Sequence, residues 1–129
     1  MTIFFCLKKL PHIISIRCSE NKKIACIKTF CMSGEIIISI GFCEKGEGGA
    51  FVEEGHLRRG GSLPMNTDGG SLSSCHSGMR GTMLITEAVR QLRGHGGESQ
   101  VPDCELALAA GCGGLLSYIG TTILGRDRR

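Results

Sequence analysis

Hydrophobic and polar positions alternate most regularly between residues 79 and 93. Apolar side chains recur there at spacings of three and four, at Met79, Met83, Leu84, Ala88, Val89 and Leu92. Such spacing places side chains on one face of an α-helix. The segment ends at Gly94, a residue type favoured just after a helix because it accepts a left-handed backbone. The pattern therefore predicts one helix over residues 79–93, with its apolar stripe packed against a sheet.

Two short apolar runs after this helix have the composition of strands. Residues 104–110 (CELALAA) form a buried run, and residues 115–125 (LLSYIGTTILG) contain several β-branched side chains. GCGG at residues 111–114 separates the two runs and predicts a tight turn. Ahead of the helix, residues 41–66 alternate short apolar stretches with glycine turns, which indicates a further strand. The order strand, helix, strand, turn, strand predicts an α/β fold with a mixed sheet and a covering helix.

The first 40 residues differ in composition from the rest of the chain. They contain only one of the 20 glycines, and their isoleucine-rich runs at residues 12–16 and 35–40 favour strands. No capping box or hairpin turn organises these runs. We divide the chain into a non-matching leader, residues 1–40, and a body, residues 41–129. The leader either adds one or two strands to the body or is an abnormal start with little fixed order, and we expect the second.

Charge and cysteine content exclude several classes of function. Residues 1–35 hold six basic residues against two acidic ones, whereas the rest of the chain holds nine against ten. The net charge of +3 therefore comes from the leader, which has no RGG repeat or long basic run, and we expect no nucleic acid partner. No apolar stretch is long enough to predict a membrane span. Eight cysteines without a CxxC pair predict free thiols in a reduced, cytoplasmic protein without a bound metal.

A polar loop at residues 66–78, NTDGGSLSSCHSG, carries the candidate chemistry. Gly69 and Gly70 lack side chains, which lets the backbone approach a ligand closely. His76 lies just ahead of the predicted helix, where free N–H groups disfavour an imidazolium. We therefore expect a neutral imidazole at pH 7, which suits a base that takes a proton from a thiol.

The stretch NTDGGSLSSCHSGMRG, followed by a helix and then by a G-x-G-G turn between two strands, resembles the C-terminal domain of the thiolase superfamily. Four segments resemble sequences of the lipid-transfer-protein and acetyl-CoA acetyltransferase-like branch of this superfamily: GFCEKGEGG, LPMNTDGG, EAVRQLRG and LSYIGTTILGR. The resemblance runs in order through residues 41–126. It implies a partial thiolase fold, the βαββ portion of the C-terminal domain.

This resemblance implies acyl transfer between coenzyme A thioesters, by Claisen condensation or by thiolysis of a 3-ketoacyl-CoA. His76 would activate a nucleophilic cysteine and bind a thioester oxygen, and Gly113 would offer its N–H to an oxyanion hole. Gly114, together with Gly69 and Gly70, would complete the backbone around the substrate. Acyl-CoA is then the substrate, and no tightly bound cofactor is implied.

Three departures from the family pattern change the expected activity. Ser77 stands where the family usually has a proline. The family's second cysteine would fall at Gly111, so Cys112, one residue away, is a weaker acid–base candidate. The N-terminal half with the nucleophilic cysteine has no counterpart in residues 1–40. We therefore predict a segment that is inactive alone and that needs a thiolase N-terminal half or a full-length thiolase subunit.

Missing strands would leave an open sheet edge and exposed apolar surface, so a homo-oligomer is also expected. The alternative function is a non-catalytic fragment that binds acyl-CoA or a lipid, or that pairs with full-length subunits.

Other reactive side chains have plainer interpretations. Cys75 adjoins His76, but neighbours at a helix entrance usually point in different directions, which argues against a nucleophile–base pair. The spacing of Cys26 and Cys31 from these two residues fits no standard zinc site. Three arginines are expected on a solvated face, with contact to coenzyme A phosphates as the alternative: Arg58, Arg59 and Arg80. Three histidines without a motif are expected at the surface: His12, His56 and His95.

Overall fold

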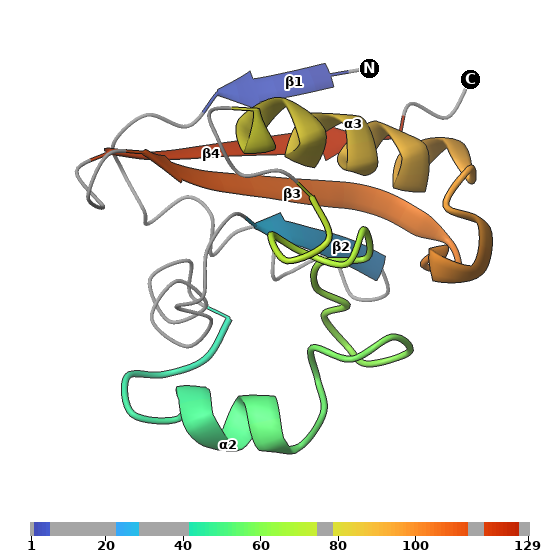
Figure 1. Ribbon diagram of the computed structural model, residues 1–129. Coiled ribbons are helices and arrows are strands. Elements are labelled where there is room, and N and C mark those ends of the chain that lie inside the picture. The colour runs from blue at the N-terminus through green and yellow to red at the C-terminus, as the bar shows by residue number, and fades with distance from the viewer. Residues whose placement is uncertain (1, 6–22, 29–41, 75–78, 114–117, 127–129) are drawn as a thin grey trace.

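The computed structural model describes residues 2–5, 23–28, 42–74, 79–113 and 118–126. Four strands form one mixed sheet with the order β1-β4-β3-β2 (Figure 1). Their bounds are Thr2–Phe5 for β1, Lys23–Lys28 for β2, Cys104–Gly113 for β3 and Tyr118–Gly125 for β4. β3 and β4 run antiparallel, β1 pairs antiparallel with β4, and β2 pairs parallel with β3.

Helix α3, Arg80–Arg93, lies across one face of the sheet (Figure 1). It begins one residue after the predicted start and ends at Gly94, whose backbone is left-handed as expected, with φ of 75°. Its apolar stripe packs on β3 and β4, which confirms the predicted packing for most of the stripe; Met79 is the exception and stays half exposed. The buried side chains on this face are Leu84, Ala88, Leu92, Val101, Cys104, Ala107, Ala109 and Leu124.

The opposite face of the sheet is covered by residues of the segment 42–65, to which helix α2, Gly48–Glu53, contributes Phe51. Leu108 and Ile123 point to this face, whereas their neighbours Ala107 and Leu124 point towards α3, as expected for alternating strand residues. Leu63 and Ala110 complete the buried cluster, against which four half-buried side chains pack: Phe42, Phe51, Leu57 and Met65.

The strand predicted within residues 41–66 is wrong. This segment contains helix α2, glycine turns and a single bridge residue at Met65. Gly55 and Gly60 adopt positive φ, 82° and 84°, which confirms the glycine turns predicted within this segment. The first strand of the βαββ unit is instead β2, which precedes this segment in the chain.

The long hairpin of β3 and β4 corrects the turn predicted at residues 111–114. Residues 111–113 continue β3, and the ladder extends to the pair Gly113 and Tyr118. Gly111 pairs with Gly120 across the ladder. Gly111 and Gly113, which are predicted in the turn, are therefore strand residues. The predicted α/β class, with a mixed sheet and a covering helix, is confirmed.

Two strands come from the first 40 residues. β1 pairs with β4 and β2 pairs with β3, which corresponds to the alternative in which this segment adds strands to the body. The isoleucine-rich runs at residues 12–16 and 35–40 lie outside the described residues. Within the described part of the chain, no helix is both long and apolar enough to cross a membrane.

Candidate functional site

A tight polar loop, residues 66–74, leads towards helix α3. Gly69 and Gly70 both have positive φ, 90° and 76°, which favours glycine. A Cβ atom on Gly69 would lie 2.1 Å from Ser73 Oγ. The Gly70 N–H donates to Asp68 Oδ1 at 3.1 Å. The backbone conformation of the loop thus explains why residues 69 and 70 are glycines. Their predicted contact with a substrate stays a prediction.

The first residue of α3 is tied to this loop by a buried ion pair. The Arg80 side chain is 2% exposed, and its two terminal nitrogens donate to the two Asp68 oxygens at 2.5 and 3.0 Å. The first of these nitrogens also donates to Ser74 Oγ at 3.0 Å. Such a two-point fork is the geometry for which a guanidinium is suited.

Asp68 is ionised in this environment. Burial by itself raises the pKa of the Asp68 carboxyl, but the hydrogen bond from Arg80 and the Gly70 N–H act against it. Together with the positive charge of Arg80, they hold that pKa below its ordinary value of 3.8. The ion pair therefore persists throughout the neutral range.

The prediction that three arginines lie on a solvated face is confirmed for two of them and wrong for the third. Arg58 and Arg59 are exposed, in agreement with the predicted solvated face. The same prediction is wrong for Arg80, because its guanidinium is buried against a carboxylate twelve residues earlier in the chain. Its terminal nitrogens are committed to Asp68 and Ser74, so they are not open to a coenzyme A phosphate.

A second buried polar network fixes the opposite side of the loop to the middle of α3. Glu87 Oε1 accepts hydrogen bonds from Thr67 Oγ1 at 2.7 Å and from Gln91 Nε2 at 2.8 Å. Arg90 donates to Glu87 Oε2 at 2.9 Å, and Gln91 Oε1 accepts from the Val101 N–H at 2.8 Å. Each buried polar group in this chain of contacts has a partner, so the network stabilises the loop rather than straining it.

Cys112 and Gly113 lie at the far end of β3. Cys112 is paired with Ile119 and Gly113 with Tyr118 in the antiparallel ladder. Gly114, which is predicted to line the substrate site, lies outside the described residues. The structure thus places Gly113 at the last described rung of the ladder, and its role as a donor stays a prediction.

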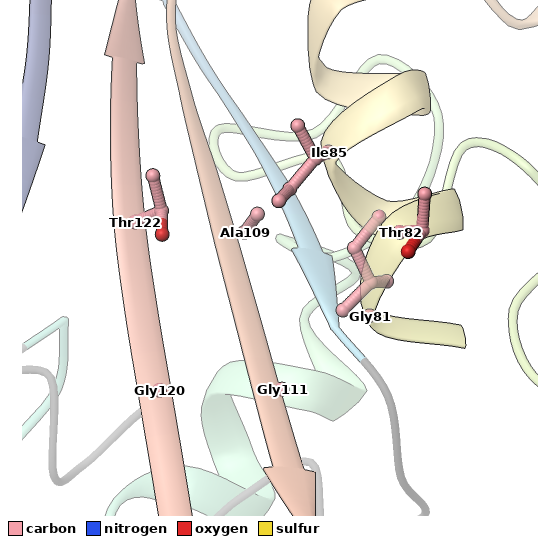
Figure 2. A pocket seen from close by; sticks show the side chains of 8 residues that line it. Gly81, Thr82, Ile85, Ala109, Gly111, Gly120 and Thr122 are labelled. Carbon is pink, nitrogen blue, oxygen red and sulfur yellow. The ribbon is translucent and has the colours of Figure 1, made fainter. Parts of the chain in front are cut away.

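A hollow of about 350 Å³ lies between the first turns of α3 and the β3–β4 ladder (Figure 2). Gly81, Thr82 and Ile85 line it from the helix, and these three residues are exposed. Gly111 and Gly120 line it from the paired strands, where two absent side chains leave the space open. The remaining lining residues are Leu84, Ala109 and Thr122.

The structure does not describe the predicted base, His76, but it describes the chain on both sides of it, up to Ser74 and from Met79. His76 and Cys75 lie between Ser74 and Met79, outside the described residues. The hollow brings the first turn of α3 next to Gly111, two residues before Gly113. The end of the helix that follows His76 and the end of the strand that carries Gly113 therefore lie beside each other.

Sequence reasoning missed the polar residues that hold this region together. Asp68 lies in the predicted glycine loop and Glu87 and Gln91 lie in the predicted helix, but no buried role is predicted for any of the three. A usable signal was present, because Glu87 and Gln91 are four residues apart and so share a helix face with the apolar stripe. The partner of Arg80 has no such local signature.

The remaining histidines and metal-ligand side chains lie outside this region. His95 is exposed, as expected; His56 is half-buried, stacks on Phe51, and bonds Ser62 and Glu54 through its two ring nitrogens. Among the described residues, no three His, Cys, Asp or Glu side chains gather as a metal site requires. His12 lies outside the described residues.

Comparison with known proteins supports the predicted resemblance to thiolases, both in sequence and in fold. The chain is 38% identical over 87 residues to an acetyl-CoA acetyltransferase of Methanothermobacter thermautotrophicus, a match that covers 66% of this chain and 23% of that protein. It is 39% identical over 71 residues to sterol carrier protein 2 of Rattus norvegicus, covering 54% of this chain and 13% of that protein. A solved Ltp2-ChsH2(DUF35) aldolase superimposes with a TM-score of 0.70 at 34% identity, covering 81% of this chain and 27% of that one.

The chain thus spans about a quarter or less of the length of these relatives. The family described as thiolase C-terminal domain-like matches residues 32–126, a segment that starts nine residues ahead of the resemblance predicted from the motifs and has the same end. This match includes the double-glycine loop, helix α3 and the β3–β4 hairpin. The chain therefore belongs to the thiolase C-terminal domain-like family.

Proposed function

We propose that the chain is the C-terminal catalytic segment of a thiolase-type acyltransferase that acts on coenzyme A thioesters. In this proposal it supplies the base, His76, and an oxyanion donor, Gly113, but no nucleophile. The nucleophilic cysteine comes from an N-terminal half or from a full-length thiolase subunit. The similarity to an acetyl-CoA acetyltransferase supports the class of substrate.

The glycine-lined hollow is the observation that carries the proposal. It lies where the helix after His76 meets the strand that carries Gly113, and it is open because Gly81, Gly111 and Gly120 have no side chains. A space of this kind next to two candidate catalytic segments suits the insertion of a chain segment that brings a thiol to the thioester. Apolar and hydroxyl side chains from Ile85 and Thr82 line its rim (Figure 2).

In the proposed reaction, the thiol of the other half loses its proton to the neutral His76 imidazole. The thiolate attacks the thioester carbonyl carbon, a C–S bond to the enzyme forms, and the C–S bond to coenzyme A breaks. The proton on His76 then passes to the departing coenzyme A thiolate. The Gly113 N–H donates to the oxygen that carries negative charge between these two steps, a contact that can contribute about 3–4 kcal/mol.

A complementation assay tests this proposal. The chain is mixed with the N-terminal part of the Methanothermobacter enzyme, cut before the region that matches, and condensation of two acetyl-CoA molecules, which releases free coenzyme A, is followed. We expect no turnover from either piece alone and measurable turnover from the complex. His76→Ala in the complex should lower the rate by about 10²–10⁴-fold, the usual contribution of a general base. His95→Ala, at an exposed position, is the matched control and should leave the rate unchanged.

A second variant tests the role of the hollow. Space is open around Gly120, since a Cβ there would meet no atom within 4 Å. Gly120→Val should therefore fold as stably as the unchanged chain, because a β-branched residue suits a strand. It should nevertheless prevent assembly with the N-terminal half.

Two results with the unchanged chain would contradict the proposed function. One is a stable complex with the N-terminal half that shows no turnover, and the other is turnover by the chain alone.

The alternative function is binding of acyl-CoA or a lipid without catalysis, or pairing with full-length subunits. Similarity to sterol carrier protein 2 supports it, together with three exposed apolar side chains on one part of the chain: Leu72, Met79 and Ile85. The same exposed surface supports self-association into a homo-oligomer. Binding of an acyl-CoA that is unaffected by His76→Ala, with no turnover in any complex, would favour this alternative.

A further inference from the structure

The loop that follows helix α2 joins a glutamate, a histidine and a serine in one hydrogen-bonded row. His56 Nδ1 lies 2.8 Å from Ser62 Oγ, and His56 Nε2 lies 2.9 Å from Glu54 Oε2. Both ends of the row reach the surface, because Ser62 is exposed and the Glu54 side chain is 66% exposed. Polar contacts between exposed groups add little to folding stability, so stability alone does not account for the row.

The backbone of the loop is shaped to bring the serine to the imidazole. The Leu63 N–H donates to the His56 carbonyl oxygen at 2.9 Å, which folds the chain back on itself. Gly61 lies so close to this chain that a Cβ atom on it would be 2.2 Å from the same carbonyl oxygen. A residue without a side chain permits this approach, and the hydroxyl of the next residue, Ser62, then meets the ring.

The His56 imidazole is held in one orientation from three sides. Its ring stacks on Phe51, with ring centroids 4.4 Å apart and an interplanar angle of 24°. Phe51 in turn packs against the buried cluster that includes Leu63. With Ser62 at one ring nitrogen and Glu54 at the other, the ring is fixed relative to the sheet. A base with a fixed position is what proton transfer within a reaction requires.

The glutamate decides which ring nitrogen carries the proton. A carboxylate can only accept hydrogen bonds, so the protonated nitrogen of His56 is Nε2, which donates to Glu54. In the neutral ring, Nδ1 then has a lone pair, and the Ser62 hydroxyl donates to it. A serine, a base in contact with it and a carboxylate that orients the base form the arrangement of a nucleophilic triad. The two ring nitrogens exchange their roles relative to the serine protease case.

A positive charge lies beside the row. The Arg58 Cδ and Nε atoms are 3.4 and 3.6 Å from the position of a Cβ atom on Gly55, the residue between Glu54 and His56. Arg58 is exposed, so a small molecule can approach it. A carbonyl oxygen gains negative charge when a nucleophile attacks its carbon, and a cation close to it stabilises that charge.

We propose that Ser62 is a nucleophile that accepts an acyl group from an activated carboxylic ester, with His56 as its base and Glu54 as the residue that orients the base. The Ser62 oxygen attacks the carbonyl carbon and forms a C–O bond, while its proton passes to His56 Nδ1. The C–O bond to the leaving group then breaks, and the leaving oxygen takes the proton from His56. The products are acyl-Ser62 and the free alcohol.

This activity goes beyond the acyl transfer proposed above and does not depend on it. It needs neither His76 nor a second chain, so either proposal can fail while the other stands.

Labelling with diisopropyl fluorophosphate tests the nucleophile. The Ser62 oxygen should displace fluoride from phosphorus, and the stable adduct is located by peptide mass spectrometry. Ser73 is the internal control, because it is also exposed but its hydroxyl donates to the Gly69 carbonyl instead of to an imidazole. We expect Ser62 to react at least about 10²-fold faster than Ser73, the smaller end of what a general base contributes. Equal labelling of the two serines would overturn the proposal.

Two substitutions distinguish a base from a structural brace. His56→Gln keeps hydrogen-bonding groups but cannot take the proton, so Ser62 labelling should fall by about 10²-fold or more. Glu54→Gln keeps a partner for Nε2, but an amide can also donate and no longer fixes the ring proton there. Its labelling should fall by between about 10-fold and 10⁴-fold, the larger value being the effect of such a change in a buried triad.

Circular dichroism establishes whether each variant folds. Unchanged Ser62 labelling in a folded Glu54→Gln chain would reduce the row to a brace and overturn the proposal. If either variant fails to fold, the comparison of Ser62 with Ser73 in the unchanged chain still decides.

p-Nitrophenyl acetate tests the class of substrate. The acetyl group, located by peptide mass spectrometry after an acid quench, should be found on Ser62 and not on Ser73, and Ser62→Ala should abolish the modification of this peptide. An acetyl group on His56 in place of Ser62, or equal acetylation of the two serines, would overturn the ester as the substrate even where the fluorophosphate reacts.

Discussion

Removing the carboxylate from the ion pair at the start of α3 should be among the most damaging single changes to this fold. In Asp68→Ala, the Arg80 guanidinium stays 2% exposed and loses both oxygens that neutralise it. Breaking one partner of a buried ion pair costs about 3–5 kcal/mol, since the remaining charge is neither solvated nor paired. A small domain has only about 5–15 kcal/mol of stability in total, so the loss should be plain in an unfolding curve.

The decisive measurement is a double-mutant cycle by urea unfolding, followed by far-UV circular dichroism. Arg80→Met removes the charge while keeping much of the side-chain volume, so Asp68→Ala combined with Arg80→Met should regain at least about 2 kcal/mol over Asp68→Ala alone. Glu54→Ala is the matched exposed control; its partner bond to His56 is largely solvated, and its loss should cost less than about 1 kcal/mol. An Asp68→Ala chain within about 1 kcal/mol of the original, or strictly additive effects in the cycle, would refute the reasoning.

Three further predictions concern the titration of Asp68, the space at two glycines and the burial of a core leucine. The pKa of Asp68 is lowered in the folded chain, so its stabilisation is present above its ordinary value of 3.8 and is lost as the pH falls below it; acid unfolding curves of Asp68→Asn and the original chain should converge there. Gly96→Ala should cost about 1–3 kcal/mol, because a Cβ would lie 2.9 Å from the backbone Cα of Gln100, whereas Gly49→Ala, in open space on α2, should be neutral or stabilising. Leu84→Ala, at a site 1% exposed, should cost about 2–5 kcal/mol, against less than about 1 kcal/mol for its 46% exposed neighbour in Ile85→Ala; thermal unfolding compares the pairs.

The parts of the fold that could be predicted are those set by local patterns. Helix α3 has a stripe of apolar residues at helical spacing and a glycine that ends it, and the structure reproduces both within one residue. Residues 106–110 are apolar on both faces of a strand because both faces of β3 are covered, by α3 on one side and by residues of the segment 42–65 on the other. In each case neighbouring residues in the chain contain the full signal.

Predictions failed where the local residue pattern does not contain the interaction that decides the structure. Gly111 and Gly113 look like turn residues, but their pairing with residues 118–120 keeps them in an antiparallel ladder. β2 pairs with β3 across about 80 residues of chain, and no local pattern specifies that register. Helix α2 is a single short element that begins with two glycines, so its propensity is too weak to distinguish it from a loop.

The candidate site divides in the same way. The motif around His76 identified the family from a few residues at fixed spacing, and the match to residues 32–126 confirms the family. The ion pair beside it could not be predicted, since an arginine at a helix start is by default an exposed residue. Only the packing of the loop onto the helix shows that Asp68 and Arg80 are buried together.

The region where α3 begins combines a loop that is fixed by buried polar contacts with an open hollow beside it. The loop at residues 66–74 is held to α3 by the buried Asp68–Arg80 ion pair and by the hydrogen bond from Thr67 to Glu87. Such supporting contacts are typical of a site whose side chains must keep fixed positions. Beside this rigid part, three glycines leave a hollow, and Met79 and Ile85 stay exposed, although filling the space would stabilise the chain. The combination of a fixed loop and an open hollow is what the proposed insertion of another chain segment would use.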